Sequence, residues 1–161
     1  MLDRREAIIQ RLLVIAEGVD GVPFAFRNRL DLSERQRPAI VILDSDEVVD
    51  AGGSGQGRSP RAASIVSMTP EILILLQDSA DRTGSAGVGA ALNNIRARFL
   101  RAVLSDSTLA TLTGPNGSIR YEGCATGLSR GRNMEGEMGI SLAFQYPLIT
   151  AELIVPEPEA E

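Results

Sequence analysis

The chain contains no histidine, lysine or tryptophan, and its single cysteine is Cys124. Without histidine, the usual Ser-His-Asp and Cys-His forms of nucleophilic catalysis and the common histidine-based zinc sites are excluded. Without lysine, Schiff-base chemistry and the phosphate-binding lysine of a P-loop are excluded as well. A lone cysteine cannot form an intrachain disulfide. The sequence therefore predicts a protein that is not an enzyme and that uses neither a cofactor nor a metal ion.

Acidic residues outnumber basic residues, and the basic residues are all of one type. All 16 basic residues are arginine, and the 21 acidic residues give a net charge of −5. A dedicated nucleic-acid binder should have a strong positive excess, so this charge argues against that class. No apolar run approaches the roughly 20 residues needed to cross a bilayer, and the charged start of the chain is unlike a signal peptide. We expect synthesis in a cytoplasm and no membrane partner.

In the first half of the chain, hydrophobic periodicity predicts one helix followed by strands. Apolar spacing predicts a helix over 3–17, which an Asp3–Glu6 pair begins in the manner of a capping box. Alternation predicts a strand over 22–29, and the apolar run 39–43 predicts a strand buried on both faces. The glycine-rich segment 50–61 is typical of a flexible hairpin tip, with 63–76 as the return arm.

The return arm contains an ambiguous step at Thr69-Pro70-Glu71. Threonine followed by proline is compatible with the start of a helix. The apolar residues that follow lack helical spacing, so we favour a strand that is broken at Pro70.

The second half of the chain predicts two helices and then two strands. We expect helices over 85–104 and 107–113, strands over 118–125 and 137–148, and a glycine- and arginine-rich loop over 127–133. The acidic segment 151–161 is expected to be a mobile tail with no core contacts. The order α-β-β-β-α-α-β-β indicates one α+β domain over 1–150, with a mixed, largely antiparallel sheet and helices on one face.

Two motifs suggest chemistry but have simpler readings. The glycines at 84, 87 and 89 follow the order G-x-x-G-x-G, which is not the order of a dinucleotide-binding loop, and they are more typical of a hinge before a helix. Asp44, Asp46 and Asp50 at a strand end are compatible with a magnesium site, although acids there are usually solvated.

Charged residues also supply candidate contacts between subunits. Arg96, Arg98 and Arg101 form the densest basic cluster, which is either a solvated helix face or a surface that meets the acids of a neighbouring subunit. The candidate assembly residues are Arg96, Arg98, Arg101, Asp44, Asp46, Arg58 and Arg61.

Several segments, taken in order, resemble one family. They cover most of the chain and are similar to tail terminator or tail completion proteins of long-tailed bacteriophages and phage-like particles. The segments are Arg27-Asn28-Arg29, residues 37–44, residues 68–72, Arg98-Phe99-Leu100, residues 118–123 and residues 144–148.

The resemblance implies a hexameric ring on the head-proximal end of the tail tube. Such a ring ends tube growth, contacts the tail tube protein and the neck or connector proteins, and lets DNA pass through its lumen. The expected location is the virion, at the junction of tail and neck. Two alternatives stay open, namely a head–tail adaptor or other neck ring, and a small nucleotide- or DNA-binding module.

Overall fold

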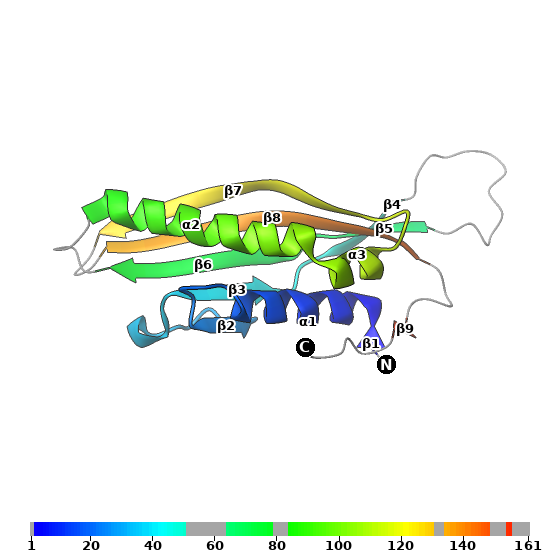
Figure 1. The fold of residues 1–161 in the computed structure, drawn as a ribbon, viewed down its shortest axis with the longest axis horizontal. Coiled ribbons are helices and arrows are strands. Elements are labelled where there is room, and N and C mark those ends of the chain that lie inside the picture. Colours follow the sequence, from blue (N-terminus) through cyan, green and yellow to red (C-terminus); the bar gives the residue numbers. More distant parts are fainter. Residues whose placement is uncertain (1, 51–63, 79–83, 131–133, 149–153, 156–161) are drawn as a thin grey trace.

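One mixed sheet, with helices packed on one of its faces, makes up the body of the protein (Figure 1). The computed structural model describes residues 2–50, 64–78, 84–130, 134–148 and 154–155. The helices are α1 (Arg4–Glu17), α2 (Gly84–Ser105) and α3 (Ser107–Thr113), with a short 3-10 turn, η1 (Glu34–Gln36). The sheet contains β2 (Phe24–Arg27), β3 (Ala39–Leu43), β4 (Glu47–Asp50), β5 (Ser64–Met68), β6 (Glu71–Asp78), β7 (Ser118–Arg130) and β8 (Met134–Leu148). The predicted α+β class is confirmed.

The long strand β8 lies at the centre of the sheet. Both β5 and β6 pair with the same side of β8, and β7 pairs with its other side. Met68 is opposite Phe144 and Glu71 is opposite Ser141, so the register continues unchanged across Thr69 and Pro70. Strands β5 and β6 are therefore two parts of one strand line, which confirms the predicted strand broken at Pro70.

A second interrupted strand line lies beside the first. Strand β3 pairs with β6 and β4 pairs with β5, with residues 44–46 between them. The backbone amide of Thr69 donates a hydrogen bond of 3.4 Å to the carbonyl of Asp46 and so joins the two interruptions. Strand β2 runs parallel to β3, and every other pairing described in this sheet is antiparallel. The predicted mixed, largely antiparallel sheet is confirmed.

Alternation along β8 separates the two faces of the sheet. Ile140, Leu142, Phe144 and Tyr146 are buried in the cluster that contains the helices. A smaller apolar cluster, on the opposite face, contains Leu32, Ala39, Val41, Leu73 and Leu75. Strand β3 contributes to both clusters, so it is buried on both faces as predicted.

Side chains cap the helix ends, and of the predicted Asp3–Glu6 capping box only the Asp3 half forms, because the Glu6 carboxylate binds Gln10 and Arg27. The Asp3 carboxylate accepts hydrogen bonds from the backbone amides of Arg5 and Glu6, which begins α1. Asp106 accepts one from the amide of Leu109 at 2.7 Å and begins α3, and Gly114 ends that helix with a φ of 76°. The polar and charged side chains at these ends satisfy amides that have no partner inside the helix.

Some predicted boundaries are wrong. The loop predicted over 127–133 is shorter, because β7 continues to Arg130 in register with β8. The strand predicted over 22–29 is limited to 24–27. The predicted tail without core contacts is wrong at β9 (Ile154–Val155), which pairs with β1 (Leu2–Asp3), and Val155 packs against the core. The hairpin tip lies outside the described residues, apart from its first residue, although β4 and β5 pair as its arms.

Two glycines on opposite faces of the sheet provide a test of this packing. A Cβ at Gly136 would lie 2.5 Å from Val88 Cγ1 and 2.9 Å from Leu92 Cδ1, whereas one at Gly127 would have no atom within 4 Å. We expect Gly136→Ala to lower the free energy of unfolding by about 1–3 kcal/mol, because α2 must move away from β8. The matched variant Gly127→Ala should leave it unchanged or raise it by up to about 1 kcal/mol. Denaturant unfolding of both variants measures this, and equal losses would contradict the packing described.

Candidate assembly surfaces

Asp44, a candidate contact residue, already has hydrogen-bond partners within its own chain. Its carboxylate accepts hydrogen bonds from Arg27 at 2.8 and 2.9 Å, and Arg27 also binds both oxygens of Glu6 at 2.7 and 2.8 Å. The amide side chain of Asn28 accepts a further hydrogen bond from the Asp44 backbone amide. Arg27 therefore joins the first turns of α1 to the end of β3.

This arginine changes the acidity of both carboxylates. Hydrogen bonding to Arg27 is the main cause that lowers the pKa of Glu6 below its ordinary 4.5 and that of Asp44 below its ordinary 3.8. The same bonds, chiefly the one to Asp44, raise the pKa of Arg27. Next to this network, Arg5 of α1 donates a hydrogen bond to the carbonyl of Ser45. The link between β3 and β4 is thus held by charged groups of α1.

Replacing Arg27 with methionine tests this network. The variant should lose about 1–2 kcal/mol of unfolding free energy at neutral pH, since two partly buried carboxylates lose their common partner. Because the folded pKa values are lowered, the stabilisation is fully present above pH 4.5, the ordinary pKa of Glu6. It is lost as the pH falls through the lowered values, so the two proteins should converge in acid. Unfolding curves across pH measure this difference.

The control for that experiment is Arg29→Met. Arg29 pairs with Asp31 at 3.4 Å, and the side chain of Asp31 is 88% exposed. Exposed ion pairs contribute little, so this variant should cost less than about 1 kcal/mol. A wild-type-like acid profile in Arg27→Met, or an equal loss in Arg29→Met, would contradict the role given to Arg27.

The three arginines of α2 do not form one cluster. Arg96 Nη1 lies against β7 and donates to the hydroxyl of Tyr121 at 3.1 Å and to the Cys124 sulfur at 3.8 Å. Arg98 donates to the backbone carbonyl of Asp20 at 2.9 Å, in the loop after α1. Arg101 is exposed, and its side chain makes no hydrogen bond or ion pair within the described part of the chain. The predicted cluster is therefore divided among three surroundings.

The remaining candidates differ in what the structure says of them. Asp46 is exposed, and its backbone carbonyl accepts the Thr69 amide. Arg58 and Arg61 lie outside the described residues, as does the side chain of Asp50. Among the described residues, no group of acidic or thiol side chains is arranged to hold a metal ion.

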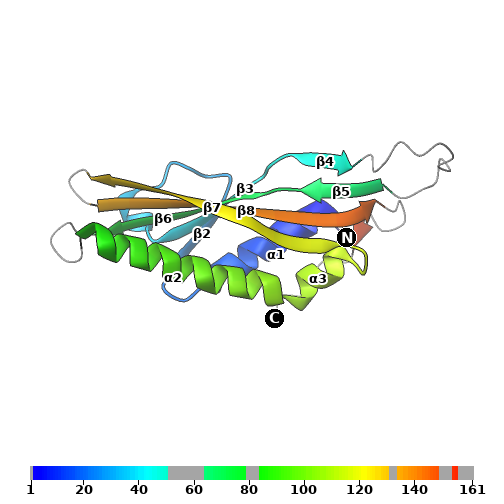
Figure 2. The same cartoon turned by 90° about the horizontal axis from the view of Figure 1, so that it is seen from above.

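Charge is separated between the two sides of the sheet. Helix α2 carries Arg96, Arg98 and Arg101 and no acidic residue, whereas residues 39–50 carry four acids and no base. Figure 2 shows β4 on one side of the sheet and α2 on the other. Acidic residues are therefore concentrated at the β3–β4 end of the sheet and arginines on α2, and Asp44, Arg96 and Arg98 already have partners within the chain.

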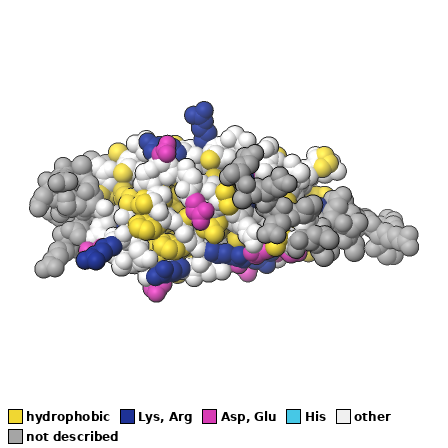
Figure 3. Space-filling model, turned by 60° about the horizontal axis from the view of Figure 1, so that its bottom comes forward, with side chains coloured by type: hydrophobic (Ala, Val, Ile, Leu, Met, Phe, Trp, Pro, Cys, Tyr) yellow, Lys and Arg dark blue, Asp and Glu magenta, His cyan; other side chains and the backbone are white. Residues whose placement is uncertain are grey.

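Three strands of the sheet have one unpaired side among the strands that the structure describes: β2, which pairs only with β3, and the two strands β4 and β7. The 13-residue strand β7 pairs only with β8, and β4 pairs only with β5, among the strands that the structure describes. Exposed apolar residues lie on both of these edge strands: Val48 (62% exposed) and Val49 (48%) on β4, and Tyr121 (38%) and Leu128 (48%) on β7. On the face shown in Figure 3, apolar side chains gather near the centre, with charged residues of both signs around them.

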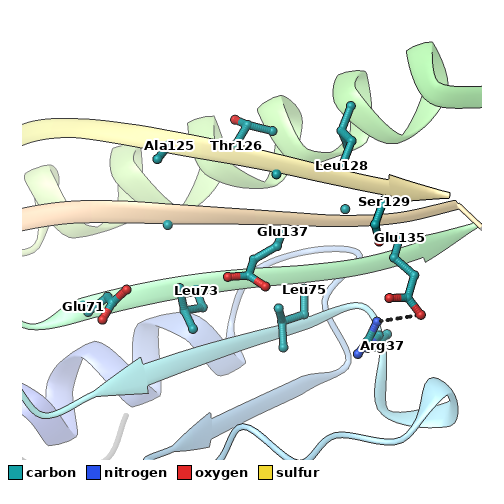
Figure 4. A pocket seen from close by; sticks show the side chains of 13 residues that line it. Arg37, Glu71, Leu73, Leu75, Ala125, Thr126, Leu128, Ser129, Glu135 and Glu137 are labelled. Atoms are coloured by element: carbon teal, nitrogen blue, oxygen red, sulfur yellow. Dashed lines mark ion pairs between the residues drawn. The ribbon is translucent and has the colours of Figure 1, made fainter. Parts of the chain in front are cut away.

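The face of the sheet opposite the helices is hollowed by a groove of about 510 Å³ between β6, β8 and β7 (Figure 4). Leu73 and Leu75 form one side of the groove, next to the small residues of β7 and β8. Its acids are Glu71, Glu135 and Glu137, of which Glu135 pairs with Arg37 at 3.6 Å. An acidic groove of this kind repels phosphate groups and favours a cationic partner.

Comparison with known proteins adds no assignment. No family model matches the chain, and no curated protein matches it in sequence. Within the described residues, no helix is long and apolar enough to cross a membrane. The valine pair of β4 is absent from the predicted contact residues, although two adjacent β-branched residues between acids are a usable signal for an edge strand.

Proposed function

We propose that this chain is a structural virion protein that forms a ring, hexameric by resemblance, at the head-proximal end of a phage tail tube. The observation that carries the proposal is the polarity of the protomer: an acidic open edge at β4 and an arginine-bearing flank formed by α2 and β7. A closed ring of identical subunits needs two different, complementary patches on each copy. This polarity supplies two such patches.

The resemblance supports the same reading along the chain. Its segments fall on β2, β3, the β5–β6 interruption, α2, β7 and β8, which together form most of the sheet and the longest helix. In the proposed role, the ring ends growth of the tail tube and binds the neck or connector proteins. DNA passes through the lumen, and the net charge of −5 disfavours its retention. A neck adaptor ring would use the same patches with different axial neighbours.

Imaging of tails tests the proposal. Tails from particles that contain this protein should carry a six-fold annulus at their head-proximal end, and deletion of the protein should give tubes of uncontrolled length. Labelling of the protein with a short epitope identifies its place in the tail. An annulus on the connector side with tubes of normal length would favour the neck adaptor, and absence of the protein from virions would refute both.

A DNA-shift assay tests the alternative of a nucleic-acid module. We expect no shift of generic duplex DNA at physiological salt, because the acidic groove opposes phosphate and two of the three α2 arginines are engaged within the chain. Binding that weakens steeply with salt would instead support a DNA-binding role. The variant Arg101→Gln would then show whether the exposed arginine of α2 is responsible.

A further inference from the structure

Strand β4 is a four-residue edge strand with an acid at each end, Glu47 and Asp50, and two apolar residues between them. Neighbouring residues of a strand point to opposite faces, so the exposed Val48 and Val49 leave both faces of β4 apolar and uncovered. Natural sheets guard such edges with lysine, proline or bulges. The chain has no lysine, and β4 has neither proline nor a described bulge. An apolar edge of this kind is suited to pairing with another strand.

Strand β7, at the other edge of the sheet, has the complementary features. One of its sides has no partner among the described strands, it carries the exposed Tyr121, and its pairing with β8 shifts by one residue between Tyr121 and Gly123. Arg120 lies on the strand itself, where it pairs with Glu122 at 3.2 Å, and Arg96 lies beneath the strand on α2. Acidic residues precede and begin β4, namely Asp46, which is exposed, and Glu47, whose carboxylate accepts a hydrogen bond from the Tyr146 hydroxyl at 3.0 Å. The start of β4 is therefore acidic, the start of β7 carries an arginine–glutamate pair, and both edges expose an apolar side chain.

The topology fixes how two copies can meet. Each of the pairs β4–β5, β5–β8 and β8–β7 is antiparallel, so β4 and β7 run in opposite directions within one copy. A second copy placed beside the first in nearly the same orientation brings its β4 antiparallel to β7. The registers also place Glu47 of β4 and Ile119 of β7 at the same height along the strand direction. Glu47 is opposite Met68, Met68 is opposite Phe144, and Phe144 is opposite Ile119.

We propose that β4 of one copy pairs with the β7 edge of a second copy near residues 118–122. Val48 and Val49 are covered in this contact, and Asp46 lies near Arg120. In the proposed ring, this pairing is the contact between neighbouring subunits. The inference depends on the proposed function only for the number of copies in the assembly. Charge favours β7 over the groove as the surface that binds β4, because the acids of β4 would meet Glu71 and Glu137 in the groove.

A valine-to-lysine comparison tests the contact. The double variant Val48→Lys/Val49→Lys should weaken self-association of the full chain about tenfold or more, measured by sedimentation velocity and native mass spectrometry. The matched control is Val14→Lys on α1, because Val14 is 51% exposed but lies on no sheet edge. The control should associate like the wild type, and all three proteins should have the same unfolding midpoint.

A charge exchange tests the pairing of residues. Asp46→Arg and Arg120→Asp should each weaken association, and the double variant should restore at least part of it, since opposite charges again face each other. Glu17→Arg, at an exposed acid of α1, is the control and should have little effect. In the assembled wild type, backbone amides of residues 118–122 should exchange with deuterium more slowly than in the monomer.

The outcomes separate this inference from the proposed function. Rings that persist in Val48→Lys/Val49→Lys, or unchanged exchange in residues 118–122, would overturn the β4–β7 contact while leaving the ring itself intact. A wild-type chain that never self-associates, in solution or on tails, would overturn the contact as well. The proposed function fails on a different result, namely absence of the protein from the tail end.

Discussion

The charge-assisted hydrogen bonds of Arg27 to Glu6 and Asp44 hold the structure together at its least regular place. There, β3 ends and β4 begins, and the neighbouring strand line is broken at Thr69 and Pro70. Regular strand pairing cannot stabilise an interruption, so a side chain with five donors in a fixed plane takes its place. Because this junction sets where β4 begins, the position of one open edge depends on a helix at the start of the chain.

The other edge depends on β8, which organises both layers of the protein. Its alternate residues bury apolar side chains under the helices, and the residues between them are mostly small or polar. Gly136 illustrates the fit on the helix face, where Val88 and Leu92 occupy the space of a Cβ. With β5 and β6 on one side, β8 leaves its other side to β7 alone, and nothing described covers β7 beyond that.

Local signals allowed much of this fold to be predicted. The caps Asp3 and Asp106 act on amides two or three residues away, so a short window contains the information. Long-range pairings were not accessible in this way: the partner of Asp44 is Arg27, 17 residues earlier, and Val155 finds its place next to β1. The spacing of the α2 arginines suggests one cluster, but a step of two residues on a helix turns Arg96 away from Arg98 and Arg101, which lie on neighbouring positions three residues apart. The separate partners of Arg96 and Arg98 follow from that rotation.

The unbroken register across Thr69 and Pro70 has a consequence for the length of the chain. Side chains alternate between the faces of a strand, so one residue added or removed at this interruption would exchange the faces of either β5 or β6 relative to β8. Val66 and Met68, or Ile72 and Ile74, would then leave the core together. The interruption therefore tolerates a change in length as poorly as the interior of a continuous strand does. Relatives of this protein should vary in length elsewhere and keep the spacing between Met68 and Glu71 constant.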